Sequence, residues 1–157
     1  MTDTSNTSTH ETALHQLIWM LGLWMVCFKQ GCLADNFQEN WVWKLIVTQP
    51  EMLLSQFNAL SDDTIIQLLH TILMFTDPAN TFVIKDEIFS VFEIFINFII
   101  ERETIRNKET MKLMFLFQCR RYKRKNGVNI SERHYSRVLE AIDSNRNVVM
   151  MLKVIGA

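Results

Sequence analysis

The chain has 157 residues, of which 48% are hydrophobic and 21% are charged. Those proportions suit one compact globular domain, or one block of a longer array, and argue against a disordered, collagen-like or disulfide-stapled chain. With only four glycines and two prolines, the sequence has few residues for tight turns, which argues against a hairpin-rich β fold.

The two parts of the sequence carry opposite charge. Residues 1–100 contain 11 acidic and 3 basic side chains, a balance of −8, whereas residues 101–157 contain 6 acidic and 13 basic ones, a balance of +7. The net charge of −1 for the whole chain is therefore the sum of an acidic part and a basic part that nearly cancel. Such a field can steer an acidic partner to the C-terminal part. The alternatives are that two lobes of the chain attract one another, or that sequence drift left the gradient.

The cysteines indicate a reducing compartment. The chain has three cysteines, Cys27, Cys32 and Cys119, so they cannot all pair in disulfides within the chain. None of them has a second cysteine or a histidine at the spacing of a zinc site. The longest apolar run covers residues 17–28 and its 12 residues are fewer than the roughly 18 that span a bilayer. No Lys or Arg precedes this run, unlike in a signal peptide. We therefore expect an intracellular protein, nuclear or cytoplasmic, with no membrane span.

Apolar residues recur at helical spacing along the whole chain, which predicts an all-α fold of seven to eight helices. The polar residues 1–11 are expected to form a disordered tail, and residues 12–157 a single all-helical domain that is complete or part of a longer helical array. Helix starts are unevenly spaced and no motif recurs at a fixed distance. Both an irregular helical bundle and a short HEAT/armadillo-like solenoid block fit this pattern.

Three helices are predicted in the first part of the chain, over residues 12–30, 36–47 and 52–60. This part also holds all four tryptophans. Trp41 and Trp43 are two residues apart, so they lie about 200° apart on a helix and do not both face one core. We expect one of the pair to be exposed or to contact a partner, although core packing is the commoner fate of tryptophan.

The next two helices are marked by a cap and by a polar stripe. Ser61 followed by two aspartates is typical of a helix start, and Asp77-Pro78 is typical of a stop, so a helix is predicted between them. A further helix is predicted over residues 84–104, with Phe92 and Phe95 buried. Its polar residues form one narrow stripe: Asp86, Ser90, Glu93, Asn97 and Glu101.

The last three helices are predicted from breakers and capping residues. One covers residues 108–125 and stops at Asn126-Gly127. Asn129, three residues before Glu132, has the spacing of a capping box and is expected to open the next helix. Asp143-Ser144 is expected to begin the last one.

No catalytic motif stands out in the sequence. The four histidines are not three or four residues apart, and there is neither a glycine-rich phosphate loop nor a nucleophile elbow. We therefore expect a protein that is not an enzyme and that binds neither a metal nor a cofactor.

The strongest local signal is a basic stretch. It comprises Arg120, Arg121, Tyr122, Lys123, Arg124 and Lys125. Such a stretch is typical of a nuclear-import signal or a phosphate-binding strip, and Tyr122 is suited to stacking on a base. The alternative is a solvated helix end, since cations near a helix C-terminus are stabilised by the helix dipole.

These observations favour a non-catalytic protein–protein interaction module, an adaptor or scaffold, whose partner has an acidic surface or an amphipathic helix. The basic stretch, together with Trp41 and Trp43, is the candidate binding region. One alternative is a nucleic-acid-associated helical module that uses residues 120–125. Another is a helical-bundle regulator that binds an amphipathic partner helix in a groove.

Overall fold

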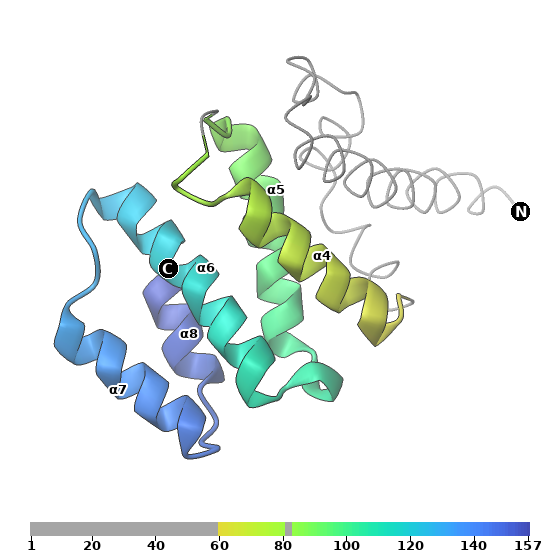
Figure 1. Ribbon diagram of the computed structural model, residues 1–157, viewed down its shortest axis with the longest axis vertical. Helices are drawn as coiled ribbons and strands as arrows, with labels where there is room; N and C mark the ends of the chain where they lie inside the picture. Colours follow the sequence, from red (N-terminus) through yellow and green to blue (C-terminus); the bar gives the residue numbers. More distant parts are fainter. Residues whose placement is uncertain (1–59, 81–82) are drawn as a thin grey trace, which may run out of the picture. The chain divides into compact units, whose positions relative to one another are not determined.

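The computed structural model describes residues 60–80 and 83–157. In these ranges the chain forms five α-helices and one short 3₁₀ helix, and no β-strand occurs there (Figure 1). They are α4 (Asp62–Phe75), α5 (Asp86–Glu101), η2 (Glu103–Ile105), α6 (Lys108–Asn126), α7 (Glu132–Asp143) and α8 (Val149–Gly156). The all-α prediction is confirmed for this part of the chain. Apart from Leu60, the predicted tail and the first three predicted helices lie outside the described residues.

The chain divides within α5 into two compact units, Met1–Phe95 and Ile96–Ala157. The division falls where the sign of the charge changes. Because residues 96–100 carry no charged side chain, the second unit has the 13 basic and 6 acidic residues counted above, and its net charge is +7. The single domain expected over residues 12–157 stays a prediction, and each unit is described by itself.

Local chemistry explains where α4 begins and ends. The Ser61 hydroxyl caps the helix by accepting a hydrogen bond from the Thr64 amide over 3.2 Å. Asp62 and Asp63 occupy the first turn, where carboxylates meet the positive end of the helix dipole. The helix ends at Phe75, ahead of Pro78, as predicted. Its apolar face is buried at Ile65, Leu68, Leu69, Ile72 and Leu73.

The polar stripe predicted for α5 is found on its surface. Four of the five stripe residues are exposed, while Glu93 is half-buried. Phe92 and Phe95 are fully buried in the first unit, as predicted. The helix ends at Glu101, earlier than expected, because Arg102 adopts an extended conformation with ψ of 107° and the chain continues as η2.

Side-chain and glycine caps define both ends of α6. Asn107 accepts a hydrogen bond from the Thr110 amide over 2.9 Å and so caps the start. At the other end Gly127 has φ of +76°, a left-handed conformation that favours glycine, and its amide donates to the Lys123 carbonyl over 2.8 Å. The predicted stop at Asn126-Gly127 is confirmed.

Two predicted helix starts are wrong. The cap of α7 is Ser131, whose hydroxyl accepts a hydrogen bond from the His134 amide over 3.2 Å, and not Asn129. Asp143 belongs to the last turn of α7 and Ser144 is the C-cap, so these two residues end a helix where a start was expected. The chain then turns at Asn145, with φ of +58°, and α8 begins only at Val149.

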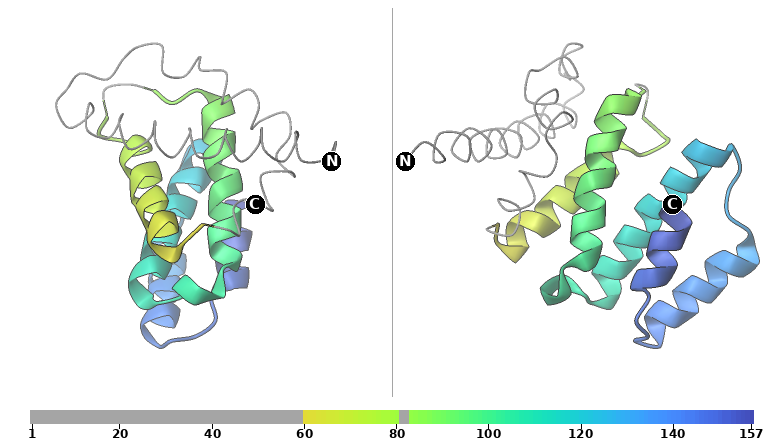
Figure 2. Two further views of the ribbon diagram at one scale, coloured as in Figure 1. Left: turned by 90° about the vertical axis from the view of Figure 1, so that its right-hand side faces the viewer. Right: turned by 180° about the vertical axis from the view of Figure 1, so that it is seen from behind.

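In the second unit, α7 and α8 both pack against α6, and Figure 2 shows the three helices side by side from behind. On the α8 side, the Gln118 amide donates to the main-chain oxygen of Leu152 over 2.8 Å. On the α7 side, the rings of Phe115 and Tyr135 have centroids 5.1 Å apart. The core of this unit is apolar and includes Ile99, Ile105, Met114, Phe115, Phe117, Val138, Ile142, Leu152 and Ile155.

Candidate functional site

The basic stretch, residues 120–125, forms the last turns of α6. Lys123, Arg124 and Lys125 are exposed, whereas the three residues before them are half-buried. The structure therefore places the predicted cations on one continuous helix. Their position at its C-terminal end also gives each cation a favourable interaction with the helix dipole, roughly 0.3–1 kcal/mol.

Some of these side chains connect α6 to its neighbours. Arg121 donates from Nη1 to Asn97 Oδ1 over 3.4 Å, a long hydrogen bond to the end of α5. The Lys125 ammonium donates to the main-chain oxygen of Ala157. The side chain of Lys123 is exposed and makes no hydrogen bond or ion pair within the described ranges. Arg121 and Lys125 thus connect α6 to neighbouring segments, whereas Lys123 contributes surface charge.

One face of α6 combines cations with an exposed apolar side chain. We call it the α6 outer face and define it as Leu116, Arg120, Lys123 and Arg124: Arg120 is four residues after Leu116, and Lys123 and Arg124 are three and four residues after Arg120. Leu116 is 40% exposed although its neighbours Phe115 and Phe117 are buried. An apolar group flanked by cations is suited to a partner that offers both an apolar and an acidic side chain.

Tyr122 does not belong to this face. It is half-buried and lies about 200° round the helix from both Arg120 and Arg124. Its carbonyl accepts a hydrogen bond from the Asn126 side chain over 3.0 Å. Tyr122 therefore lies on a different side of the helix from Arg120 and Arg124.

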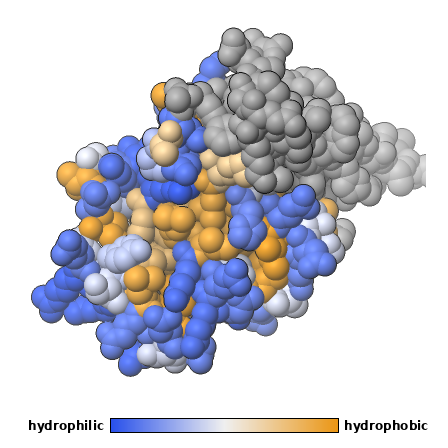
Figure 3. Space-filling model, in the orientation of Figure 1, coloured by the Kyte–Doolittle hydropathy of each residue, from blue (hydrophilic) through white to orange (hydrophobic). Residues whose placement is uncertain are grey.

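Two cations of the second unit are paired with carboxylates. Lys112 Nζ lies 2.8 Å from Asp143 Oδ1, and Lys153 is paired with Glu101. The hydrogen bond from Lys112 holds the pKa of Asp143 below its ordinary value. Even so, basic side chains outnumber acidic ones in this unit by seven, so its net charge remains strongly positive. On the face seen in Figure 3, both hydrophilic and hydrophobic side chains are exposed on the coloured part of the chain.

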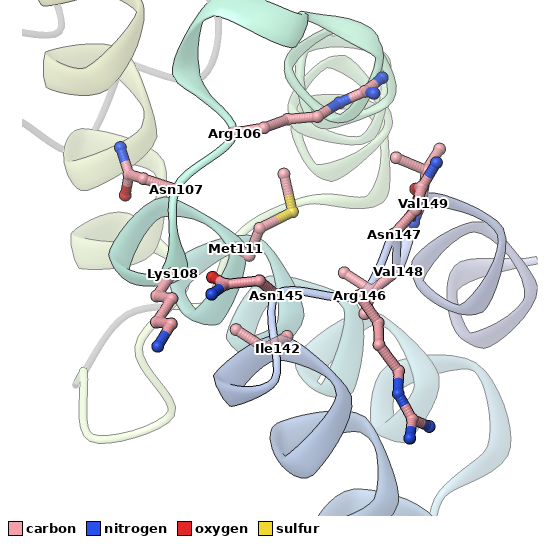
Figure 4. A pocket seen from close by; sticks show the side chains of 10 residues that line it. All are labelled: Arg106, Asn107, Lys108, Met111, Ile142, Asn145, Arg146, Asn147, Val148 and Val149. Atoms are coloured by element: carbon pink, nitrogen blue, oxygen red, sulfur yellow. Dashed lines mark hydrogen bonds between the residues drawn. The ribbon is translucent and has the colours of Figure 1, made fainter.

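A second positively charged feature lies at the opposite end of α6. Here a pocket of about 290 Å³ opens between the η2–α6 junction and the loop that connects α7 to α8 (Figure 4). It is lined by Arg106, Asn107, Lys108, Met111, Ile142, Asn145, Arg146, Asn147, Val148 and Val149. We call it the junction pocket. Sequence reasoning missed it because its two halves are more than 30 residues apart and carry no common motif.

A larger pocket of about 430 Å³ lies beside the Glu101–Lys153 ion pair, with Asn97, Phe98 and Arg121 also in its wall. Its charged groups already have partners, since Lys153 meets Glu101 and Arg121 meets Asn97. The charged groups of this pocket are therefore less available to a ligand than those of the junction pocket.

The other features considered as candidate sites give no further binding or reactive site among the described residues. Trp41 and Trp43 lie outside the described residues. Burial raises the pKa of the Cys119 thiol to about 11, which keeps it protonated and unreactive at neutral pH. Among the described residues no three His, Cys, Asp or Glu side chains gather as metal ligands would. No helix in those ranges is long and apolar enough to cross a membrane.

Comparison with known proteins gives no relative: no family model, no curated protein and no solved structure matches this chain.

Proposed function

We propose that the chain is a non-catalytic protein–protein interaction module, an adaptor or scaffold, that binds an acidic partner on the α6 outer face. The observation that carries the proposal is the exposed Leu116 followed on the same helix face by Arg120, Lys123 and Arg124. The surrounding unit has a net charge of +7, which would attract an acidic partner over a distance and raise its association rate.

The spacing of the outer face favours a helical partner. Arg120 is four residues after Leu116, and Lys123 and Arg124 are three and four residues after Arg120, which is the spacing at which side chains line one side of a helix. An amphipathic helix with acidic residues at the same intervals would place carboxylates opposite the cations and an apolar side chain over Leu116. Exposed ion pairs contribute only about 0.2–1 kcal/mol each, so the apolar contact and the total buried area would provide most of the affinity.

A nucleic-acid-associated module is the second candidate, and the run of cations at residues 120–125 is the observation in its favour. Phosphate contacts would give an affinity that falls steeply with salt for any sequence. Tyr122 lies away from the α6 outer face, so a base stacked on its ring would lie on a different side of the helix from Arg120 and Arg124.

The test is a substitution of Arg120, Arg121, Lys123 and Arg124 by Gln. Glutamine has a helix propensity close to that of Arg and Lys, so the far-ultraviolet circular dichroism spectrum should remain helical. Binding of a designed amphipathic peptide with Glu at three- and four-residue intervals should weaken at least tenfold, with most of the change in the association rate. A control variant that replaces two exposed cations of α7, Arg133 and Arg137, by Gln should change the affinity less than twofold.

Two results would overturn the proposal. One is equal peptide affinity for the wild type, the fourfold variant and the control. The other is tight binding of single-stranded or duplex DNA, lost in the fourfold variant and falling at least a hundredfold between 50 and 200 mM salt, on the order expected for several phosphate contacts. The second result would establish the nucleic-acid reading instead.

The finer architecture is part of the same proposal. Counting the helices predicted before residue 60, the chain would have seven to eight helices arranged as an irregular bundle or as a short HEAT/armadillo-like solenoid block. Either arrangement presents helix faces to partners. The predicted nuclear or cytoplasmic location is compatible with such a role.

A further inference from the structure

The junction pocket has the composition of an anion site. Its floor is apolar, formed by Met111, Ile142, Val148 and Val149. Its remaining lining residues are three cations and three asparagines, and no carboxylate is among them. This contrasts with the larger pocket, where the cationic Lys153 is paired with Glu101.

The three cations lie at different sides of the pocket. Figure 4 shows Arg106 along one side, and Lys108 and Arg146 extending outward from the rim on the other. Neither Lys108 nor Arg146 makes a side-chain hydrogen bond or ion pair within the described ranges, and both are exposed. Long side chains anchored at a rim can fold over a ligand without moving the backbone.

Arg106 adds an unmet donor in the pocket wall. Its Nη2 donates to the main-chain oxygen of Glu101 over 3.3 Å, while its Nε is buried and has no hydrogen-bond partner. A buried donor without an acceptor costs roughly 1–3 kcal/mol. An oxyanion bound in the pocket would supply an acceptor once the guanidinium group rotates to turn Nε toward it.

The backbone around the pocket adds positive potential. Asn107 caps the start of α6 and Asn147 accepts from the Val149 amide at the start of α8 over 3.1 Å, so two helices begin at the pocket. Each helix start carries a partial positive charge of about half an elementary charge. These ends reinforce the cationic side chains, which are the primary evidence.

We propose that the junction pocket binds the phosphate group of a small molecule. A dianion matches several cations and two helix starts better than a singly charged carboxylate does. The apolar floor and a volume of about 290 Å³ leave room for a small apolar group attached to the phosphate, and the volume is at the low end for small-molecule sites. This site is at the other end of α6 from the α6 outer face, and the proposal does not depend on the protein-binding function.

The experiment follows backbone amide resonances of the whole chain at constant ionic strength while inorganic phosphate or phenyl phosphate is added. Amides of residues 106–108 and 145–149 should shift saturably. Phenyl phosphate should bind more tightly than inorganic phosphate, because its ring covers the apolar floor. Acetate should bind at least tenfold more weakly than phosphate.

The matched variants each remove two exposed cations. Lys108→Gln with Arg146→Gln should weaken phenyl phosphate binding at least fivefold, whereas Arg133→Gln with Arg137→Gln on α7 should change it less than twofold. Both pairs are exposed, so both variants should keep the melting temperature of the wild type. Shifts that do not saturate, that centre on residues 120–125, or that respond equally to the two variants would overturn the proposal, as would equal binding of acetate.

Discussion

Gln118 of α6 donates a hydrogen bond from Nε2 to the main-chain oxygen of Leu152 in α8 over 2.8 Å. Its side chain is fully buried and lies directly against Gly156, one turn further along α8. A Cβ atom at position 156 would stand 2.7 Å from Gln118 Cδ and still closer to Nε2. The glycine therefore allows α8 to approach the amide of Gln118 closely enough for the hydrogen bond.

We predict that Gly156→Ala destabilises the protein by about 1–3 kcal/mol, the usual cost of overpacking a core. The added methyl group displaces a side chain that is held by a hydrogen bond and by close packing. Urea unfolding followed by circular dichroism measures the change. In a Gln118→Ala background the same substitution should cost clearly less, because the group that it displaces is gone. Equal costs in the two backgrounds would show that Gly156 is needed for another reason.

A second prediction separates the observed cap of α7 from the one expected from sequence. Ser131→Ala should lower the free energy of unfolding by about 0.5–2 kcal/mol, because it removes the acceptor of the His134 amide. Asn129→Ala should stay within about 0.5 kcal/mol of the wild type, since this residue is exposed and lies outside the helix. The reverse order in chemical unfolding would mean that the helix starts at Asn129 after all.

Two other helix caps show what the sequence predicts well. Ser61 and Gly127 were identified correctly because each acts within one turn of the chain, through a hydroxyl three residues before an amide or through a left-handed conformation. The α5 stripe was predicted for the same reason, since helical periodicity is local. Such features need no knowledge of what packs against them.

The errors arise where two local signals compete. Asn129 and Ser131 are both good caps, and only the packing of α7 against α6 decides between them. Asp143-Ser144 has the residue types of a helix start, yet the apolar face of α7 continues through Ala141 and Ile142 and extends that helix to Asp143.

Of the two candidate sites, one could be predicted from the sequence and the other could not. The cations at residues 120–125 are contiguous and can be predicted from the sequence, although only the structure shows which of them are exposed and which are half-buried. The junction pocket was not found, because Arg106 and Arg146 are 40 positions apart in the sequence and only the packing of α7 and α8 on α6 brings their segments together. A pocket of that kind leaves no periodic signal.

The last prediction concerns the ion pair between Lys112, near the start of α6, and Asp143, at the end of α7. Lys112 Nζ and Asp143 Oδ1 are 2.8 Å apart. The pKa of Asp143 is lowered first by the hydrogen bond from Lys112 and then by the nearby charges of Lys112 and Lys108. A carboxyl whose pKa is lower in the folded state stabilises the fold above its unfolded-state pKa, about 3.9. This contribution is lost as the pH falls through the lower folded-state value.

Titration of the Asp143 side-chain carbon resonance should therefore give a pKa below the ordinary aspartate value. In Lys112→Met the pKa should rise most of the way back, and the charge of Lys108 should account for the remainder. Half of each side chain is exposed, 46% for Lys112 and 57% for Asp143, so added salt should screen the charge part of the shift. Arg133→Met serves as the control, because it removes one exposed cation of α7 that is not among the causes of the shift. An Asp143 pKa that is the same in wild type and Lys112→Met would show that the pair does not form in solution.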